Sequence, residues 1–328
     1  MGNFERTLLQ SLCAYPPAEP IQYGEWIISP ITGGANNRLL RASGPQGDYA
    51  LKFMRQDARD RAGREYAALQ AIQQAHVLQG ELLAPEPLVL VRDLSYPLVI
   101  QHWLAGEALS LSPAQDEEWM RLLEHYAAIH RIQPVNTGTA LADASLNFAS
   151  VAQGRSVVHA QLALLPEQEH SPELLALIAR LDAWCAPDWP APVRALCRTD
   201  ANFRNFIQRP GCWASVDWEN SGWGDPAFDI ADLITHAAYL DVSPQRWAWV
   251  RERYAQLVAD AGVCQRIESY VVILLVWWVV RMARYRYELP RGLDTRLVPL
   301  PEGWEAEAIV KQQYYAEKAH AALYELGT

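Results

Sequence analysis

The chain has 328 residues, of which 50% are apolar and 20% charged, and this composition indicates a folded protein of one large or two modest domains. Asp and Glu total 38 against 28 Lys and Arg, and the net charge of −10 argues against a surface that neutralises nucleic-acid phosphates. The five cysteines lack zinc-site spacing, the N-terminus lacks a signal-peptide pattern, and the longest apolar run, residues 271–280, is too short to cross a bilayer. We therefore expect a cytoplasmic protein without a membrane or nucleic-acid partner, in which residues 271–280 belong to a buried helix.

The first hundred residues are expected to form a small β-rich lobe. Turn-forming sequences separate short apolar runs that are typical of strands, and a helix is expected from about residue 57 to 75. The predicted strands are 26–28, 38–42, 49–54, 88–91 and 98–101. The pattern breaks at 104–107, which places a lobe boundary near residue 103 and divides the chain into residues 1–102 and 103–328.

Residues beyond this boundary are expected to be mainly helical. The predicted helices, from apolar residues at helical spacing, are 117–132, 172–184, 245–261, 266–287 and 304–326. A non-helical segment from about 196 to 225 interrupts them, and its apolar runs at 205–207 and 213–216 predict a hairpin across the turn at Pro210 and Gly211. The expected fold class is α+β, with a β-rich N-terminal lobe and a larger helical C-terminal lobe.

The residues most suited to chemistry lie in that non-helical segment. Asp200 and Asn205 stand five residues apart, and Asp217 follows twelve residues later. Phosphoryl transfer needs these residue types in this order. One carboxylate accepts the proton of an attacking hydroxyl, and an amide oxygen and a second carboxylate hold magnesium against the nucleotide phosphates. The segment therefore predicts a magnesium-dependent phosphotransfer site.

The same segment resembles a known family. The run Arg198 to Asn205, followed by Val216-Asp217-Trp218-Glu219 and by Gly-Asp-Pro-Ala-Phe-Asp-Ile-Ala at 224–231, resembles the aminoglycoside phosphotransferase and choline kinase family. The resemblance implies the two-lobe protein-kinase-like fold with a nucleotide in the cleft. It also implies an ATP-dependent small-molecule kinase that moves the γ-phosphate to a hydroxyl group, with Mg²⁺ as the metal and GTP as an alternative donor.

The resemblance implies roles for individual residues in phosphoryl transfer. Asp200 matches the catalytic base, and Asn205 and Asp217 match the magnesium ligands. Lys52 matches the strand lysine that contacts the α- and β-phosphates, and Glu65 matches the helix glutamate that pairs with it. Lys52 is also the only lysine before residue 311, in a chain that otherwise uses arginine, which favours a requirement for a compact cation at that position.

Two further segments match nucleotide-binding parts of the family. Gly33, Gly34 and Asn36 match the turn that covers the phosphates. Residues 99–103 match the hinge that borders the adenine, and Gln101 and Trp103 are expected to contact the nucleotide there.

Three residues are expected to support the site, and for Asp229 a position near the acceptor end of the cleft is the alternative. The resemblance implies that Asp225 and Asp229 brace the catalytic loop, and His130 is expected to pack near that loop.

Arg198 departs from the family pattern, which usually has histidine two residues before the base. That histidine mainly organises the loop, and its replacement leaves a second reading open: a catalytically weak or inactive nucleotide-binding protein of the same fold. A protein kinase is disfavoured because the H-R-D, D-F-G and A-P-E signatures are absent. Residues 222–227 fit a degenerate dinucleotide-binding pattern, but no βαβ unit surrounds them, which disfavours an NAD-dependent oxidoreductase.

The acceptor is expected to be a small molecule that carries a hydroxyl group. Residues 210–245 contain no Lys or Arg but several carboxylates: Asp217, Glu219, Asp225, Asp229, Asp232 and Asp241. Clustered carboxylates need cations nearby, which favours magnesium and an amine-bearing or cationic alcohol. Trp277 and Trp278 are expected in the core, with an aromatic wall for a bound ammonium as the alternative.

Overall fold

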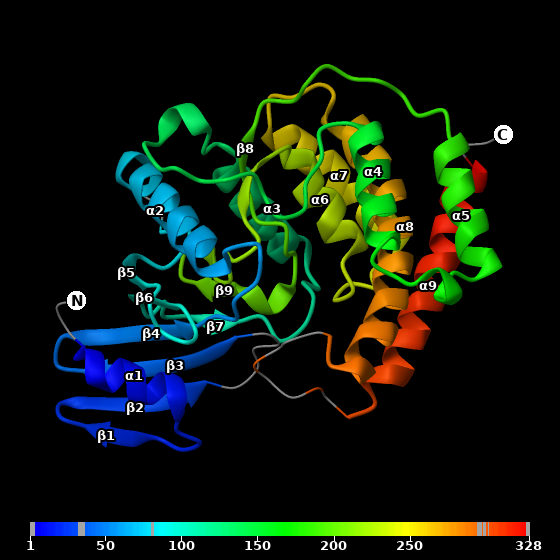
Figure 1. The fold of residues 1–328 in the computed structure, drawn as a ribbon. Helices are drawn as coiled ribbons and strands as arrows, with labels where there is room; N and C mark the ends of the chain where they lie inside the picture. The colour runs from blue at the N-terminus through cyan, green and yellow to red at the C-terminus, as the bar shows by residue number, and fades with distance from the viewer. Residues whose placement is uncertain are drawn as a thin grey trace.

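The computed structural model describes residues 4–31, 37–79, 82–293, 297, 300 and 302–325. They form an antiparallel sheet with two helices and a larger, mainly helical part (Figure 1). The predicted α+β class is confirmed. The elements of the first part are α1 (Arg6–Ala14), β1 (Ile21–Tyr23), β2 (Trp26–Ile31), β3 (Arg38–Gly44), β4 (Gly47–Phe53), α2 (Arg61–Gln79), β5 (Pro87–Val91) and β6 (Leu98–His102).

The sheet of the first lobe places one lysine on the face opposite its own core. Its strands run in the order β1-β2-β3-β4-β6-β5, and in β4 Lys52 lies between Leu39 of β3 and Val99 of β6. Side chains alternate along a strand. Leu51 and Phe53 therefore point into the apolar core that α1 covers, and Lys52 points to the other side of the sheet.

The second part contains seven helices among the described residues, together with short strands. Its elements are β7 (Glu107–Ala108), α3 (Asp116–His130), α4 (Val151–Leu162), α5 (Pro172–Ala183), β8 (Ala195–Cys197), β9 (Phe206–Arg209), β10 (Cys212–Ser215), β11 (Gly222–Gly224), α6 (Pro226–Thr235), α7 (Pro244–Leu257), α8 (Val263–Glu288) and α9 (Trp304–Glu325). The five predicted helices appear as α3, α5, α7, α8 and α9, and the predicted hairpin is β9–β10. Helices α1, α4 and α6 were not predicted from the sequence.

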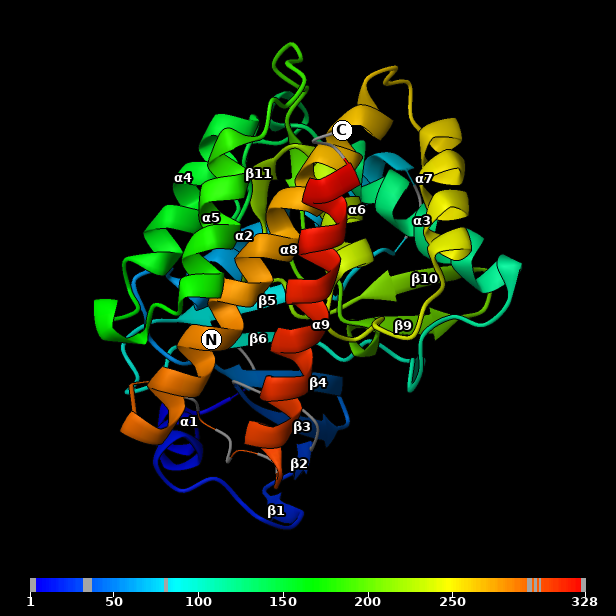
Figure 2. The same ribbon diagram turned by 90° about the vertical axis from the view of Figure 1, so that its right-hand side faces the viewer.

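Helix α8 forms the centre of the second lobe. Helices α4, α6 and α9 pack against it, and α9 runs beside it (Figure 2). By length and composition α8 could cross a membrane, but 61% of its most apolar window is buried inside the protein. Residues 271–280 thus belong to a core helix, as predicted.

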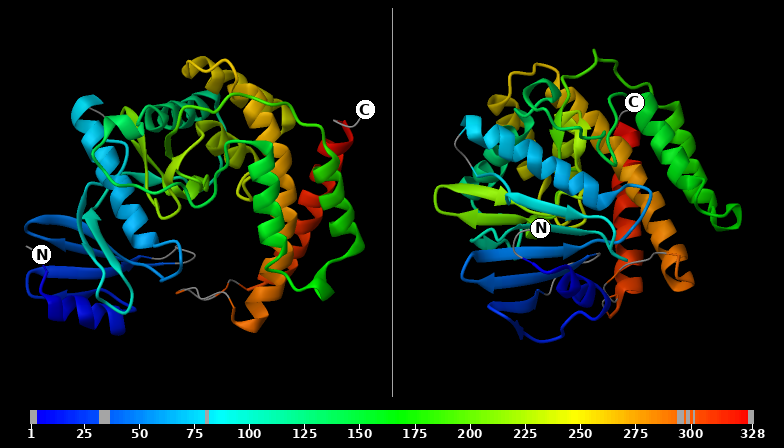
Figure 3. Two further views of the ribbon diagram at one scale, coloured as in Figure 1. Left: turned by 45° about the horizontal axis from the view of Figure 1, so that its top comes forward. Right: turned by 60° about the vertical axis from the view of Figure 1, so that its left-hand side comes forward.

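The segment from β8 to β11 lies between the sheet and the α8–α9 pair, which stand on opposite sides of it (Figure 3). β8 pairs antiparallel with β11, and β9 pairs antiparallel with β10. The strand at residues 222–224 pairs antiparallel with β8 and makes, among the described residues, one isolated parallel bridge from Trp223 to Asp143, so it does not belong to a parallel βαβ unit and the dinucleotide-binding pattern is coincidental. The loops of this segment carry the residues that the sequence singled out.

Candidate active site

A buried lysine joins the two lobes. The ammonium of Lys52 lies 2.5 Å from Oε2 of Glu65 in α2 and 2.5 Å from Oδ1 of Asp217, which follows β10. Glu65 is fully buried and Lys52 is 7% exposed, whereas 31% of the Asp217 side chain is exposed. One cation of the first lobe is therefore shared between a carboxylate of its own lobe and a carboxylate of the other.

Burial and mutual attraction set the charges of these three groups. Burial alone would lower the pKa of Lys52, but the carboxylates of Asp217 and Glu65 outweigh it and raise that pKa well above its usual range. Burial raises the pKa of Glu65 to about 7, against the opposing attraction of Lys52. For Asp217 the lysine prevails over burial and lowers the pKa. At neutral pH the site therefore holds an ammonium beside an ionised, partly exposed carboxylate.

The loop after β8 carries Asp200 and is held through its backbone. Asp229 of α6 accepts hydrogen bonds from the backbone N–H of Arg198 at 2.7 Å and of Thr199 at 3.1 Å. Asp232, one turn further along α6, accepts a hydrogen bond at 3.1 Å from the N–H that directly follows Asp200. Two carboxylates of one helix thus fix three backbone N–H groups around the proposed base.

The Asp200 carboxyl group is partly open to the site, because 22% of its side chain is exposed. Its Oδ1 accepts a hydrogen bond from the N–H of Asn202 at 3.1 Å. Burial raises the pKa of Asp200 to about 6, and the nearby charge of Asp217 acts in the same direction. A carboxylate whose pKa lies near the working pH is suited to accept the proton of a hydroxyl group.

The β9–β10 hairpin brings the two predicted magnesium ligands side by side. The N–H of Val216 donates to the carbonyl of Asn205 at 2.9 Å, and Ser215 pairs with Phe206 in the hairpin. Asp217 follows with a φ of 64°, which turns the chain away from the strand. The Asn205 side chain makes no hydrogen bond within the described part of the chain. Its amide oxygen and the Asp217 carboxylate are hard oxygen donors, and this donor set fits Mg²⁺.

Arg198 is fully buried and links the two functional loops. Its Nη2 donates to the backbone carbonyls of Asp200 and Val216, both at 3.1 Å. Its guanidinium carbon lies 5.0 Å from the ring centroid of Phe206 and 4.8 Å from that of Trp218. The arginine therefore organises the loop, which is the task expected of the histidine usual at this position.

Of the residues expected to support the loop, Asp229 contacts the loop itself and Asp225 anchors the start of α6. Asp225 accepts a hydrogen bond from the N–H of Ala227 at the start of α6 and pairs with Arg266 of α8 at 2.7 Å. Asp229 also contacts Nε2 of His130 at 3.1 Å. These contacts connect the catalytic loop to α6, α3 and α8.

A buried group of possible metal ligands adjoins this brace. The ligand atoms of His130, Cys197 and Asp229 lie within 4.8 Å of one another. The oxygens of Asp229 already accept backbone N–H groups and contact the histidine, and burial raises the pKa of the Cys197 thiol well above its usual range. A protonated thiol is a poor ligand, so the group acts as a hydrogen-bonded brace.

Of the remaining predicted nucleotide-binding residues, Gly33, Gly34 and Asn36 lie outside the described residues. Gln101 is 4% exposed and stands in β6 two positions from the residue opposite Lys52, so both side chains lie on the same face of the sheet. The buried Oε1 of Gln101 has no hydrogen-bond partner within the described ranges.

Trp103 lies just after β6, beside the strand that carries Lys52. Its backbone N–H donates to the carbonyl of Asp48 at 2.8 Å, and the guanidinium of Arg41 lies 4.7 Å from its ring centroid. The backbone N–H of Trp103 is therefore engaged within the protein, and the indole ring already contacts Arg41.

A second ion pair between the lobes was missed in the sequence. Glu219 is 2% exposed, pairs with Arg61 of α2 and accepts a hydrogen bond from Asn37, the residue before β3. Arg61 also pairs with Asp57 at 2.7 Å. The sequence signal was the position of Glu219 two residues after Asp217, but nothing in the sequence indicated a partner 158 residues away.

Most of the carboxylates in residues 210–245 are paired with cations or N–H groups of the protein itself. Asp217 pairs with Lys52, Glu219 with an arginine of α2 and Asp225 with Arg266. Asp229 and its neighbour one turn later accept backbone N–H groups. The stretch alone therefore gives no indication of a cationic acceptor.

A histidine that the sequence analysis did not single out lies between Asp200 and aromatic side chains of α8 and α9. Nε2 of His236 lies 3.7 Å from Oδ1 of Asp200. Its ring is edge-on to Trp278 of α8, which stacks on Tyr315 of α9 at 5.3 Å between centroids. Trp277 and Trp278 are half-buried at the margin of the core.

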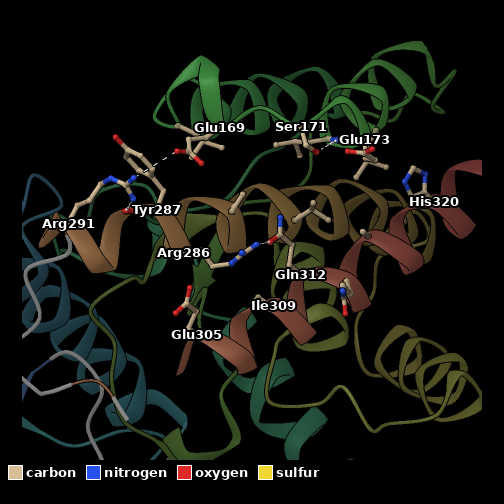
Figure 4. A pocket seen from close by; sticks show the side chains of 17 residues that line it. Glu169, Ser171, Glu173, Arg286, Tyr287, Arg291, Glu305, Ile309, Gln312 and His320 are labelled. Carbon is tan, nitrogen blue, oxygen red and sulfur yellow. Dashed lines mark hydrogen bonds and ion pairs between the residues drawn. The ribbon is translucent and has the colours of Figure 1, made fainter. Parts of the chain in front are cut away.

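A separate cavity of about 460 Å³ lies between α5, α8 and α9 (Figure 4). Its lining mixes acids and bases, among them Glu169, Glu173, Arg286, Arg291 and His320. None of the residues that surround Lys52 or Asp200 lines it. The size of this cavity therefore does not bear on the site between the lobes.

Fold and site together define a two-lobed, kinase-like phosphotransferase. The chain belongs to the Phosphotransferase enzyme family, whose sequence model matches residues 27–262. The predicted resemblance and the predicted class of enzyme, a small-molecule kinase, are confirmed at the level of this family. No curated protein matches the sequence.

Solved structures share this fold at low sequence identity. A choline/ethanolamine kinase family protein from Mesorhizobium loti is 18% identical, with a TM-score of 0.59 and 98% of both chains covered. Aminoglycoside 2'-phosphotransferase-IIIa, solved with GDP, is 13% identical, with a TM-score of 0.62 and coverage of 95% of this chain and 98% of that one. Spectinomycin phosphotransferase, solved with ADP and spectinomycin, is 13% identical, with a TM-score of 0.58 and coverage of 98% and 99%.

Proposed function

We propose that this protein transfers the γ-phosphate of magnesium-bound ATP to a hydroxyl group of a small molecule. The observation that carries the proposal is the shared ammonium of Lys52, held at 2.5 Å from both Glu65 and Asp217 and close to the loop of Asp200. A phosphotransferase needs a fixed cation for the phosphates, a carboxylate for the metal and a second carboxylate for the attacking hydroxyl. Residues 1–102 would bind the nucleotide, and residues 103–328 would supply the base and the acceptor site.

Each residue has a defined task in this proposal. Asp200 orients the acceptor hydroxyl and accepts its proton, and Lys52 binds the phosphates. Asn205 and Asp217 would hold Mg²⁺, which neutralises phosphate charge when bound. Gln101 faces the same side of the sheet as Lys52 and would contact the base. In this proposal the γ-phosphate passes directly to the acceptor, so most of the rate enhancement would come from positioning and charge stabilisation.

The acceptor we propose is an amine-bearing alcohol. Support comes from the aromatic surface near the base: Trp278 is half-buried, stacks on Tyr315 and lies edge-on to His236. An ammonium is attracted to an aromatic face within about 6 Å of the ring centroid. The fold relatives named as a choline/ethanolamine kinase family protein and as aminoglycoside phosphotransferases act on molecules of this class, which adds support by analogy.

The test is ADP release from Mg-ATP, and in parallel from Mg-GTP, with a panel of amino alcohols, aminoglycosides, thiamine and sugar alcohols. Asp200→Asn removes the proposed base, and Asp188→Asn, at an exposed loop position, is the matched control. We expect acceptor-dependent release with ATP that is lost in Asp200→Asn and retained in the control. Release with sugar alcohols alone would contradict the amine-bearing acceptor.

The same experiment separates the alternative of an inactive nucleotide-binding protein. Thermal stabilisation by Mg-ATP with no release across the panel, and no slow hydrolysis, would favour that alternative. A protein that binds neither nucleotide would overturn the assignment of Lys52, Asn205 and Asp217.

A further inference from the structure

A buried histidine stands beside the carboxylate that we propose as the catalytic base. His236 directly follows α6, the helix whose carboxylates hold the catalytic loop. Its Nε2 lies 3.7 Å from Oδ1 of Asp200, and its side chain is 15% exposed. None of the roles proposed above for the reaction uses this residue.

The backbone fixes the tautomer of His236. The N–H of Ala238 donates to Nδ1 of the ring at 3.1 Å, and a nitrogen that accepts a hydrogen bond carries no proton. In the neutral ring the proton therefore sits on Nε2, the nitrogen that faces Asp200. The N–H bond then presents its positive end to the carboxylate.

The surroundings keep this ring neutral. Burial lowers the pKa of His236 to about 4, and the charges of Lys311 on α9 and of Arg198 at the end of β8 act in the same direction. Within the described ranges, the ring also faces Asp200 of the catalytic loop, whose Oδ1 lies 3.7 Å from Nε2. Lys311 is paired with Glu307 at 2.6 Å, which moderates its influence.

The donors around Asp200 are distributed unequally between its two oxygens. Oδ1 accepts the N–H of Asn202 at 3.1 Å and faces Nε2 of His236. Oδ2 receives no hydrogen bond from the described residues. When donors hold one oxygen of a carboxylate, the other oxygen points in a fixed direction. A base needs this fixed direction, because it must meet a hydroxyl that lies in line with a phosphate.

His236 is itself held by the helices of the second lobe. Its ring lies edge-on to Trp278, with centroids 6.0 Å apart and an interplanar angle of 84°. Trp278 stacks on Tyr315, whose hydroxyl donates at 2.8 Å to the carbonyl of Thr235, the residue before the histidine. A continuous set of contacts therefore runs from α8 and α9 through His236 to Asp200.

We propose that His236 is a positioning residue for phosphoryl transfer: its Nε2–H orients Asp200 through Oδ1, leaves Oδ2 for the acceptor hydroxyl, and links the base to the α8–α9 wall. This inference rests on the proposed function of Asp200. The separation of 3.7 Å is longer than a hydrogen bond, so the contact acts by the alignment of a dipole with a charge.

The first test does not depend on activity. NMR of protein labelled with ¹⁵N-histidine should show the Nε2–H tautomer for His236, with no titration from about pH 5.5 to 8, and its signal should shift in Asp200→Asn. The His236→Asn variant assigns the resonance, and His159→Asn, at an exposed histidine, is the control. A ring protonated on Nδ1, or one that titrates near its ordinary pKa of about 6.5, would overturn the proposal.

The second test uses slow hydrolysis of Mg-ATP, with water as the acceptor, as its readout. His236→Asn should lower kcat by about tenfold with unchanged Mg-ATP affinity, and should move the acid limb of the pH profile upward because Oδ1 loses a donor. His236→Gln restores an amide N–H near the Nε2 position and should recover part of both effects. Equal loss in the two variants with an unmoved pH profile would contradict positioning and indicate a purely structural role.

Different results would contradict the role of His236 and the proposed function. If Asp200→Asn abolishes hydrolysis while His236→Asn behaves like the wild type, the inference is wrong and the proposed function stands. If neither Mg-ATP binding nor hydrolysis is found, the proposed function is wrong, and the NMR result still decides whether His236 and Asp200 interact as described.

Discussion

The two sides of the site are held together by different kinds of interaction. On the side of the sheet, side chains pair with side chains: Lys52 with Glu65 and Asp217, and Arg61 with Glu219. On the side of the catalytic loop, side chains hold backbone: carboxylates of α6 accept N–H groups, and Arg198 donates to carbonyls.

Because of this difference, the ion pairs can be exchanged when ligands bind, whereas the contacts to the loop backbone must be kept. An ion pair can exchange its partner for a phosphate or a metal with little movement of the chain. A loop held by its backbone keeps its shape whichever side chains it presents, and it tolerates arginine in place of histidine provided that the carbonyls keep a donor. The predictions below test this contrast, from the largest expected effect on activity to the smallest.

Removing the exchangeable carboxylate should have the largest effect. Asp217→Asn deletes a partner of Lys52 and a proposed magnesium ligand, so we expect kcat to fall by about 10³-fold or more. The measurement is the acceptor-dependent rate as a function of magnesium concentration, with Asp188→Asn as the control. A rate restored by excess magnesium would limit the role of Asp217 to metal affinity.

Breaking the backbone anchor should impair both activity and stability. Asp229→Asn replaces an acceptor of two buried N–H groups by an amide with fewer acceptor sites, at a cost of about 2 kcal/mol in the free energy of unfolding and about 100-fold in kcat. Urea unfolding and steady-state kinetics measure the two effects. A large loss of activity without loss of stability would mean that Asp229 acts on the substrates and not on the loop.

Replacing Arg198 should have a smaller effect on rate and a diagnostic effect on its pH dependence. Arg198→Lys keeps the charge, whereas Arg198→Met removes a cation that lowers the pKa of Asp200. The base works ionised, so activity is present above its pKa and lost as the pH falls through about 6. In Arg198→Met this loss should begin at a higher pH, with kcat at high pH within about tenfold of the wild type. Matching pH profiles for the two variants would contradict the electrostatic part of the argument.

The smallest effect on activity should come from a histidine behind the hairpin. His125 is buried against the carbonyl of Trp213 and the hydroxyl of Ser215, and burial lowers its pKa to about 3. Because the folded pKa lies below the unfolded value, its contribution is present above about pH 6.5 and is lost as the pH falls, by about 1.4 kcal/mol per unit. His125→Asn should flatten the dependence of unfolding free energy on pH from 6.5 to 4 and leave kcat at pH 7.5 unchanged. An equally steep dependence in the variant would assign acid unfolding to other groups.

Local sequence patterns predicted most of the helices and strands. They failed for elements whose formation depends on packing against other elements. The strands around Lys52 and the helices α3, α5, α7, α8 and α9 were predicted from their apolar patterns. Helix α4 was missed because its glycine and polar residues resemble a loop. In the structure a Cβ at Gly154 would lie 2.7 Å from Ile273, so that glycine allows α4 to approach α8 closely.

Only those parts of the candidate site whose residues lie close together in the sequence could be predicted. The order of Asp200, Asn205 and Asp217 was enough to predict phosphoryl transfer because these residues lie within one segment. The pairing of Arg61 with Glu219 was not visible, since the two are 158 residues apart and each is an ordinary charged residue in the sequence. His236 carried no signal either, because only the folded loop brings it to the base.

Under the proposed function, the shared ammonium of Lys52 implies that metal and nucleotide would bind as a neutralising pair. If Lys52 turned to a phosphate, Asp217 would lose its counter-ion in a partly buried position and would need a cation in its place. Nucleotide without metal would leave the carboxylate uncompensated, and metal without nucleotide would compete with the lysine for it. Each should therefore tighten the binding of the other by the same factor, a reciprocal cooperativity that follows from a single side chain serving both lobes.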